Sequence, residues 1–180
     1  MKQTPIRSTT ILGVRLGRKV ALGGDGQVTM GEMQLKSRAV KVRAFGDGQV
    51  LGGFAGAVAD ALTLFEKFEV KLEEYNQNLQ RAAVELAKDW RTDKYLRELD
   101  ALLALMDTKH SYILSGSGDI IDPEDSVFAI GSGSGYAMAA GRALVRVGEK
   151  DPKQVVQTAM EITADICIYT NDQITILELG

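Results

Sequence analysis

Two threonines near the start of the chain, Thr9 and Thr10, open a strand-like stretch that leads into a glycine-rich turn at 23–26. A threonine at the first position of a chain carries a nucleophilic hydroxyl and, in its α-amine, the base that activates it. The chain has one histidine, His110, and one cysteine, Cys167, so histidine- and cysteine-dependent hydrolysis have one candidate residue each. These residue types favour hydrolysis by an N-terminal threonine.

Thr9 becomes such a residue only if residues 1–8 are removed. The freed α-amine would have a pKa near ~8, so part of it is neutral at pH 7 and accepts the hydroxyl proton, directly or through water. A nearby cation must stabilise the alkoxide and keep the amine neutral, and Lys41 is the candidate. Asp25, in the glycine turn, is the carboxylate expected to hold that ammonium. Gly56 is expected to supply a backbone N–H to the tetrahedral oxyanion.

Each of these features also has an ordinary structural explanation. Paired threonines at a strand start reflect β-propensity, a strand lysine is commonly solvated, and an aspartate beside glycines is common in turns. The residue types alone therefore leave this structural interpretation open beside the catalytic one.

Composition limits the class of protein. The chain has 180 residues, of which 45% are hydrophobic, and this predicts one domain with a sizeable core. Its 21 basic and 24 acidic residues give a net charge of −3, which disfavours nucleic acid and anionic membranes as partners. A lone cysteine excludes an internal disulfide, and no signal-peptide core or apolar run of about 18 residues is present. We therefore expect a soluble, cytoplasmic protein.

Hydrophobic periodicity changes twice along the chain. Alternating residues in the first third predict strands at 9–16, 18–24, 28–35, 40–45 and 50–55. Spacings of three and four then predict helices at 58–75 and from 78 to about 106, the second with an irregularity at 91–93. Further patterns predict strands at 111–115, 127–130 and 174–179 and helices at 136–147 and 151–168. This order predicts one α+β domain over 9–180, with stacked sheets covered by helices on the outside.

A second glycine-rich stretch, 131–135, lies between a predicted strand and a predicted helix and suggests phosphate binding. Its spacing does not fit, because Tyr136 occupies the position where a dinucleotide fingerprint needs glycine or alanine. The turn at 23–26 also lacks the Gly-Lys-Ser/Thr that completes a phosphate loop. We therefore expect no nucleotide on this chain, and any use of ATP belongs to a partner.

Nine sequence blocks occur in order along the chain. They are TTI (9–11), GGDGQ (23–27), KVR (41–43), GFAG (53–56), ADA (59–61), TLFE (63–66), AVELAKDWRTD (83–93), AIGSG (129–133) and DICIYTN (165–171). Together they closely resemble the HslV (ClpQ) family, the proteasome-like peptidases of bacterial ATP-dependent proteases. The resemblance covers nearly the whole chain from Thr9 onward.

The resemblance implies an N-terminal-nucleophile (Ntn) hydrolase fold, a four-layer αββα sandwich similar to a proteasome β-subunit. It also implies a homododecamer of two stacked hexameric rings whose active sites face an enclosed chamber. The implied partner is a hexameric AAA-type ATPase, HslU, that unfolds proteins and feeds the unfolded polypeptides into that chamber.

The resemblance also implies a role for individual residues. Thr9 corresponds to the nucleophile, Asp25 and Lys41 to its charged supports, Ser132 to a hydroxyl near the Thr9 amine, and Gly56 to the oxyanion donor. A monovalent cation, usually sodium, is held in the family by backbone carbonyls, and this site falls on Ala164, Cys167 and Thr170. Carbonyl oxygens suit a hard cation and leave the side chains there free to vary.

The chain departs from the family at two places. Many members carry only a methionine before the threonine pair, whereas here residues 1–8 precede Thr9. We therefore predict cleavage between Ser8 and Thr9, through attack of the Thr9 hydroxyl on the preceding carbonyl. Ala57 stands where the family often has a second glycine, and its Cβ is expected to narrow the approach to Gly56.

Three functions remain to be distinguished. We expect a threonine endopeptidase that cleaves unfolded polypeptides through an acyl-enzyme on Thr9. The alternatives are a non-catalytic, proteasome-like structural subunit that retains its prefix, and an Ntn amidase that acts on small amides without an ATPase. Among the remaining side chains, His110 is expected at the surface, Cys167 as a small packed residue, and Trp90 in the core or at a subunit interface.

Overall fold

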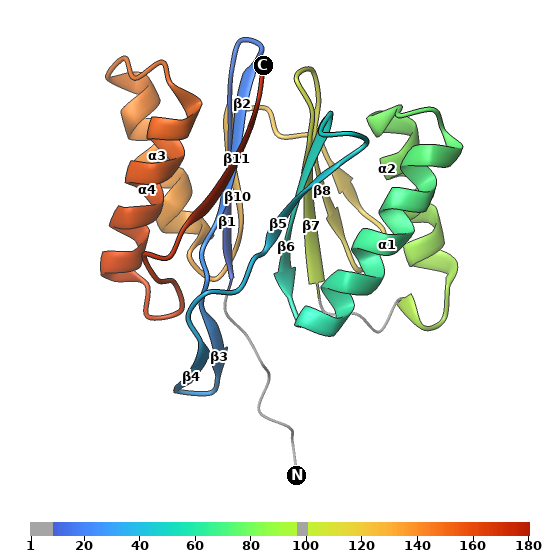
Figure 1. The fold of residues 1–180 in the computed structure, drawn as a ribbon, viewed down its shortest axis with the longest axis horizontal. Helices are drawn as coiled ribbons and strands as arrows, with labels where there is room; N and C mark the ends of the chain where they lie inside the picture. The colour runs from blue at the N-terminus through green and yellow to red at the C-terminus, as the bar shows by residue number, and fades with distance from the viewer. Residues whose placement is uncertain (1–8, 97–100) are drawn as a thin grey trace.

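The computed structural model describes residues 9–96 and 101–180. Two antiparallel sheets pack face to face, and a pair of helices covers the outer face of each sheet (Figure 1). This arrangement is the predicted αββα sandwich. None of the helices in these two ranges has the length and apolar character that a membrane span requires.

The first sheet contains Thr10 at the start of one strand, and another of its strands ends directly before Asp25. Its strand order is β10-β1-β2-β11. The bounds are β1 (Thr10–Leu16), β2 (Lys19–Gly24), β10 (Val127–Gly131) and β11 (Thr175–Leu179). The register pairs Thr10 with Gly131 and Ile11 with Gly24, so the start of β1, the end of β2 and the end of β10 meet at one edge.

The second sheet, of order β5-β6-β7-β8-β9, packs against the first. Its strands are β5 (Val42–Phe45), β6 (Val50–Gly56), β7 (Ala101–Met106), β8 (Ser111–Ser115) and β9 (Ile120–Ile121). Buried residues from both sheets, including Ile11, Leu22, Val42 and Ala104, form the core between them. Lys41 immediately precedes β5, and the sheet-to-sheet packing therefore brings it against the edge that carries Asp25.

Each helical pair buries an apolar face on its own sheet. The helices are α1 (Val58–Glu74) and α2 (Leu79–Thr92) over the second sheet, and α3 (Ser134–Arg146) and α4 (Pro152–Ile166) over the first. Asp151 caps α4 by accepting from the Lys153 N–H, with Pro152 in the first turn as predicted. Trp90, on α2, is fully buried and belongs to the core.

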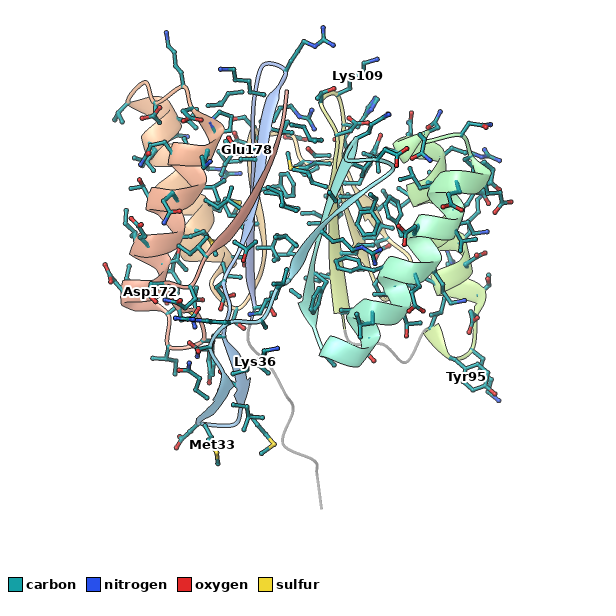
Figure 2. The ribbon with its side chains drawn as sticks, viewed as in Figure 1. Met33, Lys36, Tyr95, Lys109, Asp172 and Glu178 are labelled. Atoms are coloured by element: carbon teal, nitrogen blue, oxygen red, sulfur yellow. The ribbon has the colours of Figure 1, made fainter. Side chains whose placement is uncertain are left out.

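Two predicted elements were wrong. The second helix ends at Thr92, and the segment expected to continue it to about 106 contains strand β7, which lies between β6 and β8. Leucine and alanine favour helices, but a central strand buried on both faces also presents a continuous apolar run, so periodicity could not separate the two. The expected strand 28–35 is instead a hairpin of β3 (Val28–Met30) and β4 (Met33–Lys36), turned at Gly31 with φ +60°, and it projects beyond the sheets (Figures 1 and 2).

Candidate active site

Thr9 lies directly before β1 and is only 2% exposed. Its carbonyl accepts a hydrogen bond of 2.8 Å from the Ser132 N–H, just beyond the end of β10. Gly131 has φ +94°, and a Cβ there would lie 1.9 Å from the Thr9 carbonyl oxygen and 3.2 Å from the Ala55 Cβ. The absence of a side chain at Gly131 therefore lets β10 and the end of β6 close around Thr9.

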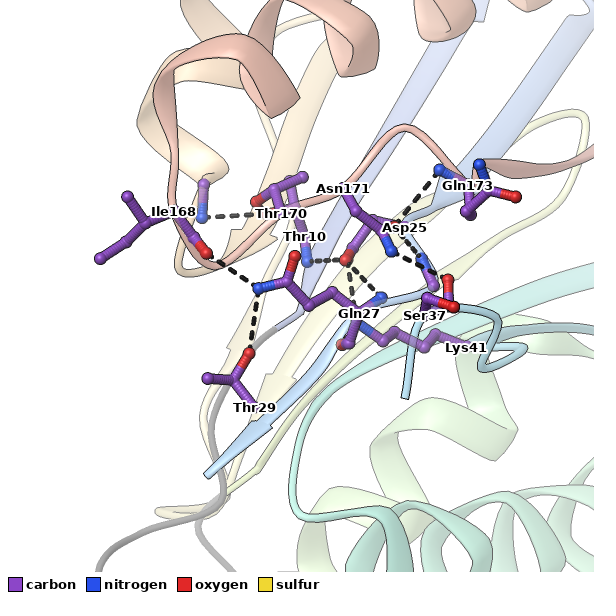
Figure 3. A network of polar contacts seen from close by, with 12 residues as sticks. Thr10, Asp25, Gln27, Thr29, Ser37, Lys41, Ile168, Thr170, Asn171 and Gln173 are labelled. Carbon is purple, nitrogen blue, oxygen red and sulfur yellow. Dashed lines mark hydrogen bonds and ion pairs between the residues drawn. The ribbon is translucent and has the colours of Figure 1, made fainter. Parts of the chain in front are cut away.

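A buried ion pair lies beside the start of β1. The Lys41 Nζ donates to Asp25 Oδ1 at 2.9 Å, and the two side chains are 2% and 0% exposed. The same Asp25 oxygen accepts the Thr10 N–H at 2.8 Å, while Lys41 also donates to the Gln27 carbonyl at 2.5 Å. Figure 3 shows these contacts converging from β1, the turn after β2 and the residue before β5. The fold thus brings the predicted residues Thr9, Asp25 and Lys41 to one place.

Burial governs the electrostatics of this pair. Removal of the ammonium from water lowers the pKa of Lys41, and the charge and hydrogen bond of Asp25 oppose that shift. Asp25 receives further support, because its Oδ2 accepts the Gln27 N–H at 2.9 Å. A buried lysine with a lowered pKa and a specific carboxylate partner is typical of functional sites. This burial also differs from the solvated lysine that the ordinary structural explanation would predict.

Two further residues predicted for the site, Ser132 and Gly56, lie after β10 and at the end of β6. Ser132 is exposed and contacts Thr9 through its backbone N–H, so the role of its hydroxyl stays a prediction. Gly56 ends β6 with φ +146°, a conformation that L side chains rarely adopt, and its role as oxyanion donor also stays a prediction. Ala57 has φ −70° and ψ 139°, so its methyl group imposes no backbone strain at this position.

The hydroxyl of Thr10 contacts the segment that follows α4, and no role for this hydroxyl was predicted from the sequence. Thr10 Oγ1 lies 2.7 Å from Thr170 Oγ1 and accepts the Gly133 N–H at 3.0 Å. Thr10 is fully buried. Strand alternation puts Thr10 on the same side of β1 as Leu12 and Val14, which are also buried, but it does not indicate the partner of the hydroxyl.

Gly133 is tightly enclosed by this hydroxyl network. A Cβ there would lie 2.4 Å from Thr10 Oγ1 and 2.8 Å from Thr170 Oγ1. We expect Gly133→Ala to lower the free energy of unfolding by about 1–3 kcal/mol in denaturant titrations, because the overpacked site must shift. Gly135→Ala is the matched control: no atom lies within 4 Å of the added Cβ, and helical alanine should leave stability unchanged or raised by about 0.5 kcal/mol. Equal effects of the two substitutions would contradict this assignment.

The carbonyls predicted to bind a cation lie at and after the C-terminus of α4. Cys167 caps the helix and is buried, its N–H donates to the Thr163 carbonyl, and its own carbonyl accepts from the Thr170 N–H at 3.0 Å. Within the ranges that the structure describes, no hydrogen bond reaches the Ala164 carbonyl. Helix C-termini carry partial negative charge on such carbonyls, so this donor set fits a hard monovalent cation. Ligation by Ala164, Cys167 and Thr170 stays a prediction.

The sequence and the fold are both similar to those of known proteins. A family profile described as "Proteasome subunit" matches residues 6–179. The fold is also similar to that in the crystal structure of eukaryotic HslV from Trypanosoma brucei, with a TM-score of 0.89. The two sequences are 46% identical, and the match covers 95% of this chain and 99% of the other.

Proposed function

The chain belongs to the proteasome family and is HslV-like, and from that premise we propose that it is a threonine endopeptidase that degrades unfolded polypeptides. The observation that best supports this activity is the buried Lys41–Asp25 pair, hydrogen-bonded to the backbone one residue after Thr9. A surface lysine or a simple turn aspartate would not require such an arrangement. A lysine charge held next to a threonine is the environment that an alcohol nucleophile needs.

The first step in this proposal is release of the Thr9 amine. The Thr9 hydroxyl attacks the Ser8 carbonyl carbon, the Ser8–Thr9 C–N bond breaks, and the amine nitrogen takes up a proton. Water then hydrolyses the resulting ester and frees the hydroxyl. Residues 1–8 lie outside the described residues, so this maturation remains a proposal about Thr9 itself.

In the mature enzyme, the neutral Thr9 amine takes the proton from the hydroxyl as its oxygen attacks the scissile carbonyl. The tetrahedral oxyanion accepts the Gly56 N–H in this proposal. Collapse breaks the C–N bond, and the leaving amine takes the proton from the Thr9 ammonium. Water, activated by the same amine, then hydrolyses the Thr9 ester and releases the acyl product.

Lys41 and Asp25 contribute electrostatics rather than proton transfer. The Lys41 ammonium stabilises the developing alkoxide and disfavours a proton on the Thr9 amine, while Asp25 fixes the ammonium and the Thr10 N–H together. A bound sodium ion would supply fixed positive charge at the end of α4. The carbonyls of Ala164, Cys167 and Thr170 would hold it.

We further propose that the chain assembles into two stacked six-membered rings and works with a hexameric HslU-type ATPase. The support is the extensive similarity to HslV. An enclosed chamber makes selectivity a matter of access, so a site with little sequence preference is safe inside a cell. The ATPase would unfold substrates and deliver them to Thr9.

Degradation of an unfolded protein tests this function. Purified chain should degrade casein faster with an HslU-type ATPase and ATP than without them. An amidase would hydrolyse small amides with no response to the ATPase. A structural subunit would retain residues 1–8 and show no hydrolysis that depends on Thr9.

Activity should depend on pH in a way that identifies Lys41. The charged form supports catalysis, so activity is present below the pKa of Lys41 and is lost as the pH rises through it. Because burial lowers this pKa from 10.5, the falling limb of kcat/KM should begin below that of an exposed lysine. Lys41→Arg should move the falling limb upward, since arginine stays protonated, even where the absolute rate drops. An unchanged falling limb in Lys41→Arg would show that another group titrates.

A further inference from the structure

The segment that follows α4, residues 168–171, contacts Thr10 and the turn 25–27 of the candidate site. The Ile168 carbonyl accepts from Gln27 Nε2 at 2.8 Å, and the Thr170 hydroxyl bonds to that of Thr10. Asn171 Oδ1 accepts the Gly26 N–H at 3.0 Å (Figure 3). Segments that are about 145 residues apart in sequence are therefore joined around the turn 25–27.

Asn171 has the most specific of these contacts. While its Oδ1 holds the Gly26 N–H, its Nδ2 donates to the Ser37 carbonyl at 2.8 Å. The two backbone stretches that it bridges also contact each other, because the Ala39 N–H donates to the Gly26 carbonyl at 2.8 Å. They pack so closely that a Cβ on Gly26 would lie 2.4 Å from the Ser37 carbonyl oxygen. The side-chain amide of Asn171 thus links the turn after β2 to the segment that precedes Lys41 through two hydrogen bonds.

The turn 25–27 supplies two acceptors of the Lys41 ammonium, Asp25 Oδ1 and the Gln27 carbonyl. Displacement of the turn would therefore alter both contacts together. Among the described contacts, none joins the Asn171 side chain to that of Asp25 or Lys41. Its effect on them would pass through the backbone of Gly26. Its amide has the two-sided geometry that this fixation requires, with one acceptor and one donor on different segments.

We infer that Asn171 is a positioning residue, which fixes the turn 25–27 so that Asp25 and the Gln27 carbonyl hold the Lys41 ammonium beside Thr9. This inference rests on the proposed function. The carboxylate of Asp25 faces Lys41, and maturation would add the Thr9 amine as a further titratable group. Loss of the Asn171 amide should weaken the contacts of the Lys41 ammonium with Asp25 and the Gln27 carbonyl. Deprotonation of Lys41 should then become easier.

The test compares Asn171→Ala with the wild-type assembly in peptide hydrolysis across pH. We expect kcat to fall at least 10-fold with KM changed less than threefold, and the alkaline limb to move down by at least 0.5 pH unit. Asn171→Asp keeps an acceptor for the Gly26 N–H and adds a negative charge. Because it cannot donate to the Ser37 carbonyl, it should recover only part of kcat, while its negative charge should keep the alkaline limb from moving down as far as in Asn171→Ala. Unchanged kcat and an unchanged limb in Asn171→Ala would overturn the inference.

Asn78→Ala is the matched control, because the Asn78 side chain also accepts a backbone N–H, that of Arg81, at the start of α2. It should lower thermal stability but leave the pH profile in place. If Asn171→Ala does not assemble, Asn171→Ser carries the same test with the same expected shift. Hydrogen exchange provides a readout without activity: Asn171→Ala should deprotect the peptide containing Gly26, and Asn78→Ala should not. Failure of the proposed function would instead abolish Thr9-dependent hydrolysis in the wild type itself.

Discussion

Thr9→Ala should abolish peptide-bond hydrolysis, with kcat/KM reduced by at least about 10³-fold. The substitution removes the hydroxyl that forms the acyl-enzyme. Among the described residues at this edge, no other hydroxyl belongs to a residue whose α-amine the proposed cleavage would free. It should also leave residues 1–8 attached, because the same hydroxyl carries out maturation. Turnover of a fluorogenic peptide and of casein, together with the intact mass, measures both effects.

Two further threonine substitutions make this result specific. Thr9→Ser keeps the hydroxyl and the amine and should retain measurable turnover. Thr158→Ala removes a hydroxyl from α4 that bonds only to Gln154 among the contacts seen in the described chain, and it should leave turnover within about twofold. Wild-type turnover in assembled Thr9→Ala would rule out Thr9 as the nucleophile.

Lys41→Met should both destabilise the fold and remove activity. Asp25 would remain fully buried without its cation, and loss of one partner of a buried ion pair costs about 3–5 kcal/mol. Two backbone N–H groups, those of Thr10 and Gln27, would still bind the carboxylate, so we expect the lower end of that range. The free energy of unfolding from denaturant titration measures the effect, and peptide hydrolysis should fall to the level of Thr9→Ala.

A double variant separates stability from catalysis. Asp25→Asn with Lys41→Met should be more stable than Lys41→Met alone, because no uncompensated charge remains buried. It should be equally inactive, because catalysis needs the ammonium. Lys153→Met breaks an exposed ion pair of similar length, to Glu178 at 2.8 Å, and should alter stability little and activity not at all. Additive stability effects of the two active-site substitutions would contradict the described coupling.

The outline of the fold followed from the sequence because most elements carry an unambiguous period. The β1–β2 hairpin and the capped start of α4 show this, and the ordered blocks indicated the αββα arrangement. Strand β7 could not be predicted, since its run Ala-Leu-Leu-Ala-Leu-Met fits a helix locally and becomes a strand only between β6 and β8. Short strands such as β9 are set by pairing rather than by their own residues.

The candidate site was predictable only in part, for a related reason. Residue chemistry and family resemblance together named Thr9, Asp25 and Lys41, and the fold brings them together. The bonds of the Thr10 hydroxyl to Gly133 and Thr170, and those of Asn171 to Gly26 and Ser37, join segments more than 120 residues apart, and no local pattern encodes such pairs. Asn171 lay within a quoted block, yet its two backbone partners became visible only in the structure.

Everything proposed for catalysis depends on a free α-amine on Thr9. N-terminal sequencing, combined with intact mass, of the purified and fully active protein tests this most directly. We predict a single sequence that begins Thr-Thr-Ile, with the mass of residues 9–180. Fully active protein that begins at Met1 would contradict the proposed mechanism, whatever the similarity of its fold.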